Sequence, residues 1–292
     1  MKPIRAVAVL PTLFTLGNLV CGFFAVVVLA RIEKPVGVEA VPAPRIEFES
    51  ARQLIDMIGS DDPTHNLMLS GALILLAMFF DSVDGQIARL TRRTSDFGAQ
   101  LDSLCDLVSF GLAPAILLVK MCPQFTSLHS EAVWTIAALF VCCAALRLAR
   151  FNVETDENDD HMSFAGLPTP AAAAAIASFA ILSYTLRNEV NIAVHAKFPI
   201  YDWWLQRVLP LFAVVIAILM VSRIPYPHPL TQLLRGQRSF AHIVAIVFAV
   251  VAILIVRGYA VPLLCVLFVL IPPLRFAWEL VRHRRTREEP LF

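Results

Sequence analysis

Charged residues are scarce in this sequence. Asp, Glu, Lys and Arg make up 16% of its 292 residues and 58% are hydrophobic, whereas a soluble domain carries about 25% charged residues. The net charge of +1 gives no electrostatic basis for binding nucleic acid. The six cysteines form neither a CxxC pair nor a Cys/His zinc pattern, so we interpret them as small apolar packing residues. The chain also lacks internal repeats and Gly/Ser linkers, which favours one integral membrane domain.

Long apolar stretches are abundant instead. A helix needs about 20 apolar residues to cross a bilayer, and about eight stretches meet or approach that length. They cover residues 4–29, 67–90, 98–119, 132–152, 168–186, 208–222, 240–256 and 260–280. The first lacks the small-residue cleavage pattern of a secretory leader, so we interpret it as a membrane helix. We therefore expect an all-α, polytopic bundle of about eight transmembrane helices.

The distribution of Lys and Arg predicts the orientation of this bundle. If the N-terminus is cytoplasmic, the cytoplasmic segments hold more Lys and Arg than the segments outside, as the positive-inside rule requires. We therefore expect a multi-pass protein of the cell (inner) membrane with both termini in the cytoplasm. Residues 30–66 would then form an extracytoplasmic insert. A solvated or interfacial cap is a simpler role for it than partner binding.

Four aspartates at helical spacing stand out in this apolar background. One helix face would carry Asp81, Asp84, Gly85 and Ala88, and the face of the next helix would carry Gly98, Asp102 and Asp106. The small residues beside the acids allow a bulky ligand to approach the helix backbone. A short polar turn joins the two helices, so they should be antiparallel neighbours with converging acidic faces. This pattern predicts a site at the cytoplasmic end of the bundle.

Carboxylates gathered this closely in apolar surroundings need cations. Oxygen ligands near phosphate suit Mg²⁺ or Mn²⁺, and a pair of such ions serves phosphoryl transfer. Arg89 lies just past the acids and can hold a phosphate oxygen through its planar guanidinium. Salt bridges from Arg89, Arg92 and Arg93 are the structural alternative, but they give no role to the intervening small residues. We therefore expect a site for two divalent ions.

The complete pattern, D-x2-D-G-x2-A-R-x8-G-x3-D-x3-D, resembles the signature of the CDP-alcohol phosphotransferase family. The resemblance implies a six-helix membrane core, a homodimer, and transfer of a phosphatidyl-type group from a CDP-linked donor to an alcohol with release of CMP. It implies that the divalent metals are bound by Asp81, Asp84 and Asp102, with Asp106 at the edge of the same cluster as the general base. It also implies that the cytidine and diphosphate are lined by Gly85, Ala88, Arg89 and Gly98.

Other segments resemble the branch of this family that uses L-serine as the acceptor. They are residues 10–23, 102–115, 147–152, 166–173 and 219–227. The implied substrates are CDP-diacylglycerol and L-serine, and the implied products are phosphatidylserine and CMP. Thr12 departs from this branch, which commonly has Asn after the proline. Residues 1–227 would form the catalytic membrane domain, and residues 228–292 a C-terminal helix pair with a basic tail.

Binding of serine would require a cation for its carboxylate. Arg147 and Arg150, followed by Asn152, lie at the cytoplasmic end of the fourth expected helix, and we expect at least one arginine to hold the serine carboxylate or a donor phosphate. Positive-inside anchoring is the alternative for both arginines. Ser109, one turn past Asp106, either contacts the substrate or packs between helices.

Two polar residues of the first expected helix, Thr15 and Asn18, have two interpretations. They either touch the nucleotide or form hydrogen bonds to a neighbouring helix.

Two other functions fit part of the pattern. A related enzyme that uses glycerol-3-phosphate or inositol phosphate would keep all four aspartates, but it would need further basic groups for the acceptor phosphate. A membrane cation transporter would also use carboxylates. Such sites usually lie near the bilayer midplane, whereas these acids are expected near one membrane face.

Overall fold

The part of the protein that the structure describes is built from helices. The computed structural model describes residues 9–32, 62–91, 96–157, 166–187, 198–226 and 259–287. The elements are α1 (Val9–Ala30), α3 (Pro63–Thr91), α4 (Asp96–Asp106), the π-helical segment η2 (Leu107–Leu112), α5 (Ala113–Met121), α6 (Pro123–Glu157), α7 (Thr169–Arg187), α9 (Phe198–Val221) and α12 (Ala260–Arg287). The expected all-α fold is confirmed for these residues.

Six helical segments of the described part are long and apolar enough to cross a membrane. They are Thr12–Ala30, Pro63–Ile87, Phe97–Met121, Glu131–Val153, Thr169–Arg187 and Ala260–Glu279. Helix α9 contributes a shorter apolar stretch, Arg207–Val221. Of the about eight spans expected from hydropathy, six therefore have the required length, and the stretch at residues 240–256 lies outside the described residues. Residues 33–61 of the insert and the predicted domain boundary after residue 227 also lie outside them.

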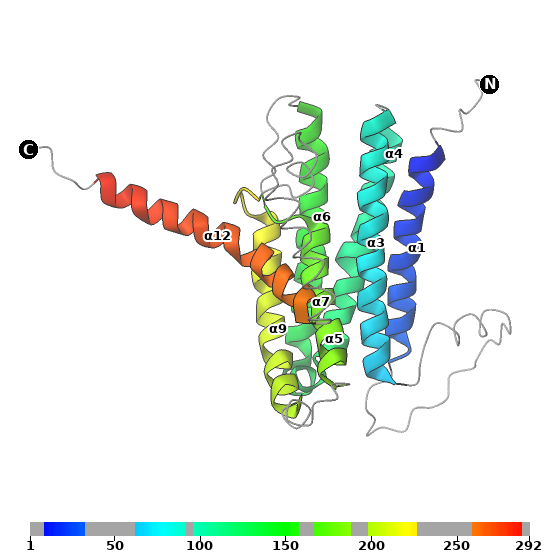
Figure 1. Ribbon diagram of the computed structural model, residues 1–292, viewed down its shortest axis with the longest axis vertical. Helices are drawn as coiled ribbons and strands as arrows, with labels where there is room; N and C mark the ends of the chain where they lie inside the picture. The colour runs from blue at the N-terminus through cyan, green and yellow to red at the C-terminus, as the bar shows by residue number, and fades with distance from the viewer. Residues whose placement is uncertain are drawn as a thin grey trace, which may run out of the picture.

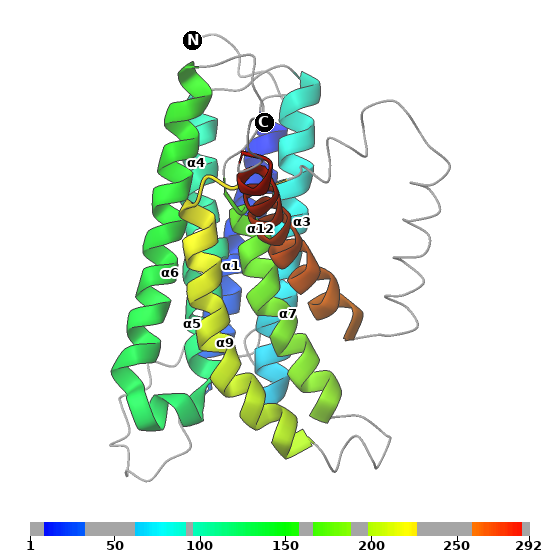
Figure 2. The same cartoon turned by 90° about the vertical axis from the view of Figure 1, so that its left-hand side faces the viewer.

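The helices form an upright bundle from which α12 leans away (Figures 1 and 2). Helix α1 packs along α3, α3 along α7, α6 along α9, and α12 against α7. The end of α3, the start of α4 and the end of α6 lie at the same end of the bundle (Figure 1). Segments far apart in the sequence therefore meet where the four aspartates were expected.

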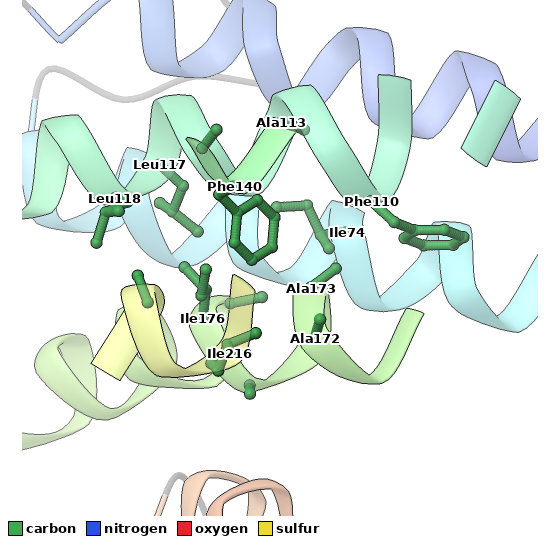
Figure 3. Packing of buried hydrophobic residues seen from close by; sticks show 14 of the residues in the cluster. Ile74, Phe110, Ala113, Leu117, Leu118, Phe140, Ala172, Ala173, Ile176 and Ile216 are labelled. Atoms are coloured by element: carbon green, nitrogen blue, oxygen red, sulfur yellow. The ribbon is translucent and has the colours of Figure 1, made fainter. Parts of the chain in front are cut away.

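The bundle interior is packed by aliphatic and aromatic side chains from eight elements, α1, α3, η2, α5, α6, α7, α9 and α12. Phe140 of α6 is fully buried and lies among Ile74, Leu117 and Ile176 (Figure 3). Helix α7 presents a series of buried alanines to its neighbours. Small residues let helix backbones approach closely in a membrane, where packing drives helix association. A Cβ added to Gly71 of α3 would lie 2.8 Å from the carbonyl oxygen of Ala177 in α7. This close contact fixes α3, which carries the first two aspartates.

The third spanning segment is not a uniform α-helix. Hydropathy predicted one helix over residues 98–119, but the structure divides the span into α4, the π-helical η2 and α5. A π-turn adds a residue to one helical turn and is frequent at functional sites. It begins directly after Asp106, and it places the hydroxyl of Ser109 3.0 Å from the carbonyl oxygen of Asn18 in α1.

Helix α12 is tied to the segment that follows α9. The hydroxyl of Tyr226 donates a hydrogen bond of 2.9 Å to the carbonyl oxygen of Val269, and its ring packs near Phe268. Burial raises the pKa of Tyr226 to about 12, so the hydroxyl keeps the proton that it donates. This contact holds α12 beside the bundle.

Candidate metal centre and active site

Three aspartates from two helices converge at one end of the bundle. One oxygen from each of Asp81 in α3 and Asp102 and Asp106 in α4 lies within 4.8 Å of the other two. Asp106 is 7% exposed, and the other two are half-buried. Helical spacing predicted these acids on two helix faces, and in the structure the two faces converge.

Asp84 lies beside this group and has a different partner. It is 7% exposed, and its carboxylate accepts a hydrogen bond from the hydroxyl of Thr15 in α1. It remains near enough to interact electrostatically with Asp102. The role of Asp84 as a metal ligand therefore stays a prediction.

Helix α1 also supplies a partner for Asp106. The side-chain amide of Asn18 donates a hydrogen bond of 2.9 Å to Oδ1 of Asp106. The sequence left two interpretations open for Thr15 and Asn18, contact with nucleotide or bonding to a neighbouring helix. Both side chains make the interhelical bond, and in both cases the acceptor is an aspartate of the signature.

The residues expected to line the donor lie on both acidic helices. Gly85 is exposed on α3, one residue past Asp84, and Gly98 is half-buried in the first turns of α4. Ala88 and Arg89 belong to the last turns of α3, but their side chains lie outside the described part. Their contacts with a nucleotide stay predictions.

Of the two candidate arginines, Arg147 interacts with two of the acids. It interacts electrostatically with Asp106 and Asp81, and its Nη1 donates a hydrogen bond to the hydroxyl of Thr169 at the start of α7. Its Nε is buried and has no hydrogen-bond partner among the described residues. Arg147 therefore combines a fixed position with an unused donor.

Arg150 is directed toward a helix end. Its Nη1 donates a hydrogen bond of 3.2 Å to the carbonyl oxygen of Val221, the last residue of α9. Such a contact satisfies a terminal carbonyl and opposes the negative end of the helix dipole. Nearby, Gly166 has a φ of +94°, and its N–H donates a bond of 2.8 Å to the carbonyl oxygen of Ile224. This arrangement gives Arg150 a structural partner that the sequence did not reveal.

The other two acceptor candidates also have partners within the bundle. The side-chain amide of Asn152 donates a bond of 3.0 Å to the hydroxyl of Ser103 in α4, one residue after Asp102. The hydroxyl of Ser109 donates to α1, as described above. Of the two interpretations of Ser109, its contact in this structure is interhelical packing, and substrate contact stays a prediction.

The acidic cluster fits a hard divalent cation. Its ligands are all oxygens, which suit Mg²⁺ and Mn²⁺. Oδ1 of Asp102 is buried and has no hydrogen-bond partner among the described residues. Like-charged carboxylates at these separations repel one another unless a positive charge lies between them. A cation held by Asp81, Asp102 and Asp106 would satisfy both the orphaned oxygen and the charge.

A comparison with protein families decides the class of this protein. The profile of the CDP-alcohol phosphatidyltransferase family matches residues 8–219, which include all four aspartates. The chain belongs to the CDP-alcohol phosphatidyltransferase family. It is a multi-pass membrane protein of phospholipid synthesis, and the resemblance inferred from the signature is confirmed.

Curated relatives narrow the comparison. The CDP-diacylglycerol–serine O-phosphatidyltransferase of Helicobacter pylori is 34% identical over 165 residues, which cover 56% of this chain and 63% of the relative. The enzyme of the same name from Methanocaldococcus jannaschii is 37% identical over 163 residues, 55% of this chain and 65% of the relative. The archaetidylserine synthase of Methanothermobacter thermautotrophicus is 36% identical over 157 residues, 53% of this chain and 56% of the relative. The matched region spans less than two thirds of each of these relatives.

Proposed function

We propose that this protein transfers the phosphatidyl group of CDP-diacylglycerol to the hydroxyl of L-serine, giving phosphatidylserine and CMP. The observation that carries the proposal is the convergence of Asp81, Asp102 and Asp106 in a chain of this family. The choice of serine is supported by relatives whose names specify a serine acceptor. A water-soluble alcohol and a lipid-anchored nucleotide can both reach a site at one end of a membrane bundle.

In the proposed reaction, the serine hydroxyl oxygen attacks the phosphorus that carries diacylglycerol. A new P–O bond to serine forms, the bond from that phosphorus to the CMP oxygen breaks, and CMP leaves with that oxygen. The hydroxyl proton passes to the carboxylate of Asp106, the general base. Asp106 is buried and accepts a hydrogen bond from the side-chain amide of Asn18.

Asp81, Asp84, Asp102 and Asp106 would hold two divalent ions, Mg²⁺ or Mn²⁺. When bound, such ions neutralise the diphosphate and stabilise the charge on departing CMP. Asp81, Asp102 and Asp106 already form one cluster, and Asp84 adjoins it through Asp102. Gly85, Ala88, Arg89 and Gly98 would line the nucleotide end, where the small side chains of Gly85, Ala88 and Gly98 leave room for the cytidine and Arg89 can hold a phosphate oxygen.

Arg147 is the proposed partner of the serine carboxylate. Serine is short, so its carboxylate must lie near its hydroxyl and therefore near Asp106. Of the two arginines, Arg147 interacts with Asp106 and retains an unpartnered Nε, whereas Arg150 bonds to the end of α9. The acceptor site would then be shaped indirectly by Arg150, Asn152 and Ser109, whose hydrogen bonds hold neighbouring helices in place.

The proposal includes the setting of the enzyme. We place both termini and the site at the cytoplasmic face of the cell membrane, because the positive-inside bias favours that orientation. The family resemblance supports a homodimer among membrane lipids. In a variant whose six native cysteines are replaced, the accessibility of single cysteines introduced near residues 93 and 160 to a membrane-impermeant thiol reagent tests the orientation. The reagent should label them in inverted vesicles and not in intact cells.

An acceptor screen tests the function. Purified protein is supplied with CDP-diacylglycerol, Mg²⁺ or Mn²⁺ and one alcohol at a time, and CMP release is measured. We expect CMP release with L-serine, and a fall of about 10²- to 10⁴-fold in Asp106→Asn. CMP release with glycerol-3-phosphate or inositol phosphate, and none with serine, would overturn the assignment of serine as the acceptor. Cation transport across the membrane without CMP release would show that the protein is a transporter and not an enzyme of this class.

A further inference from the structure

We infer that Asn18 is a positioning residue that fixes the orientation of the Asp106 carboxylate for metal binding and proton transfer. The inference rests on the proposed function for the proton-transfer role, but its structural part does not. Neither the signature nor the branch-like segments assign a role to this side chain. Three features of α1 and the segment η2 carry the inference.

The first feature is the choice of partner. Asn18 is fully buried in the middle of a spanning helix, where an amide is costly unless it is bonded. A backbone carbonyl of a neighbouring helix would satisfy it, as Ala25 does for the hydroxyl of Ser70. Asn18 bonds instead to the carboxylate of Asp106, 88 positions away in the sequence. An ionised carboxylate only accepts hydrogen bonds, so the amide nitrogen must face it.

The second feature is the buried amide oxygen that this orientation leaves without a hydrogen bond. With the nitrogen on Asp106, Oδ1 of Asn18 is buried and has no hydrogen-bond partner among the described residues. A leucine at this position would avoid that cost. The bond to Asp106 explains why an asparagine occupies this buried position. Because a carboxylate has further lone pairs, Asp106 can accept from Asn18 and still bind a cation or a proton.

The third feature is the close packing between α1 and η2. The hydroxyl of Ser109 donates to the backbone carbonyl of Asn18 itself. One turn further along α1, a Cβ added to Gly22 would overlap Oγ of Ser109 and lie 2.7 Å from its Cα. Helix α1 and η2 are therefore packed closely together at Ser109, next to the Asn18–Asp106 bond. Since η2 follows Asp106 directly, the contact of Ser109 with Asn18 holds the donor and the carboxylate close together.

The experiment measures Mn²⁺ affinity and turnover in the full-length protein. Mn²⁺ binding is followed by the electron paramagnetic resonance signal of the free ion, which requires no catalysis. The variants are Asn18→Leu, which removes the donor, and Asn18→Gln, which retains an amide on a longer side chain. The matched control is Ser70→Ala, which removes another buried interhelical bond to α1 but lies away from the acids. Thermal stability in detergent reports folding for each.

We expect Asn18→Leu to weaken Mn²⁺ binding about 10-fold and to lower kcat about 10- to 100-fold, the range found when partners of metal ligands are removed. The KM for serine should change less than the kcat. Asn18→Gln should recover part of both losses, and Ser70→Ala should match the wild-type protein. In an Asp106→Ala background, Asn18→Leu should have no further effect on Mn²⁺ affinity, because the partner is already absent.

Unchanged Mn²⁺ affinity and kcat in a folded Asn18→Leu protein would overturn the inference. So would an equal loss of Mn²⁺ affinity with and without Asp106, since that result is a general effect on folding. If Asn18→Leu does not fold, the same comparisons apply to Asn18→Ala, which also removes the donor, and wild-type affinity and kcat in that variant would overturn the inference. A wild-type protein that binds Mn²⁺ but releases no CMP with any acceptor would defeat the proposed function alone, and the Mn²⁺ measurements would still decide the role of Asn18.

Discussion

The hydroxyl of Thr15 in α1 donates a hydrogen bond to the carboxylate of Asp84 in α3. The two residues are 4% and 7% exposed, so water competes little for this bond. It gives Asp84 a protein partner while Asp81, Asp102 and Asp106 face one another. Helix α1, which carries none of the signature residues, thus holds both a neighbouring aspartate and a member of the acidic cluster.

We expect Thr15→Val to destabilise the protein by about 1–3 kcal/mol, the cost of leaving a buried polar group without its partner. Turnover should fall as well, because the Asp84 carboxylate would lose the hydrogen bond that orients it. The measurements are unfolding in detergent and CMP release. Thr15→Ser keeps the hydroxyl and serves as the matched control. A Thr15→Val protein as stable and active as Thr15→Ser would show that the bond contributes nothing.

Removal of divalent metal should abolish turnover, and Mg²⁺ or Mn²⁺ should restore it. The orphaned Oδ1 of Asp102 and the mutual repulsion of the three acids both call for a cation. Asp81→Asn and Asp102→Asn should each weaken Mn²⁺ binding at least about 10-fold, since even indirect partners of metal ligands have effects of that size. Titration calorimetry measures the affinity. Full activity in the presence of a strong chelator would contradict the metal site.

The two arginines should have separable effects. Arg147→Ala should raise the KM for serine about 10- to 100-fold, because a hydrogen bond to a charged group is worth about 1.5–3 kcal/mol. Arg150→Ala removes a contact with the end of α9, so it should lower stability more than it raises that KM. Steady-state kinetics with varied serine, alongside melting in detergent, separates the two. The assignment fails if Arg150→Ala alone changes the KM for serine.

Two glycines of α1 provide a test of the close contact with η2. Gly22→Ala should destabilise the protein by about 1–3 kcal/mol, the usual cost of overpacking, because its new Cβ would overlap Ser109. Gly17→Ala should be neutral or stabilising, since its Cβ would lie 3.5 Å from the ring of Phe80, an ordinary contact, and alanine favours a helix. Chemical unfolding of both variants in detergent provides the comparison. Equal stability of the two variants would argue against the tight crossing.

The sequence was most informative where one physical rule dominates. Lipid requires backbone groups to be satisfied within each span, so hydropathy located the helices, and α3 covers the predicted stretch at residues 67–90. Helical spacing and a short turn were sufficient to place Asp81, Asp102 and Asp106 together. These features depend on local pattern, which a single sequence contains.

Tertiary contacts were beyond that reach. The bond from Thr15 to Asp84 joins residues 69 positions apart, and no periodicity specifies such a partner. The π-helical turn at η2 also has no signature in hydropathy, because the residues Leu107–Leu112 fit an ordinary α-helix equally well. The separate partners of Arg147 and Arg150 depend on where α7 begins and α9 ends. The sequence could not distinguish the two arginines, because their spacing gives no information about the helix ends that they contact.

The central claim is that the serine hydroxyl attacks the lipid-bearing phosphorus, and isotope labelling tests it most directly. The protein is incubated with CDP-diacylglycerol, Mn²⁺ and L-serine whose hydroxyl carries oxygen-18, and both products are analysed by mass spectrometry. The account predicts labelled phosphatidylserine, unlabelled CMP, and neither product with Asp106→Asn above a trace. Oxygen-18 in CMP, or no labelled lipid while another alcohol supports CMP release, would contradict it.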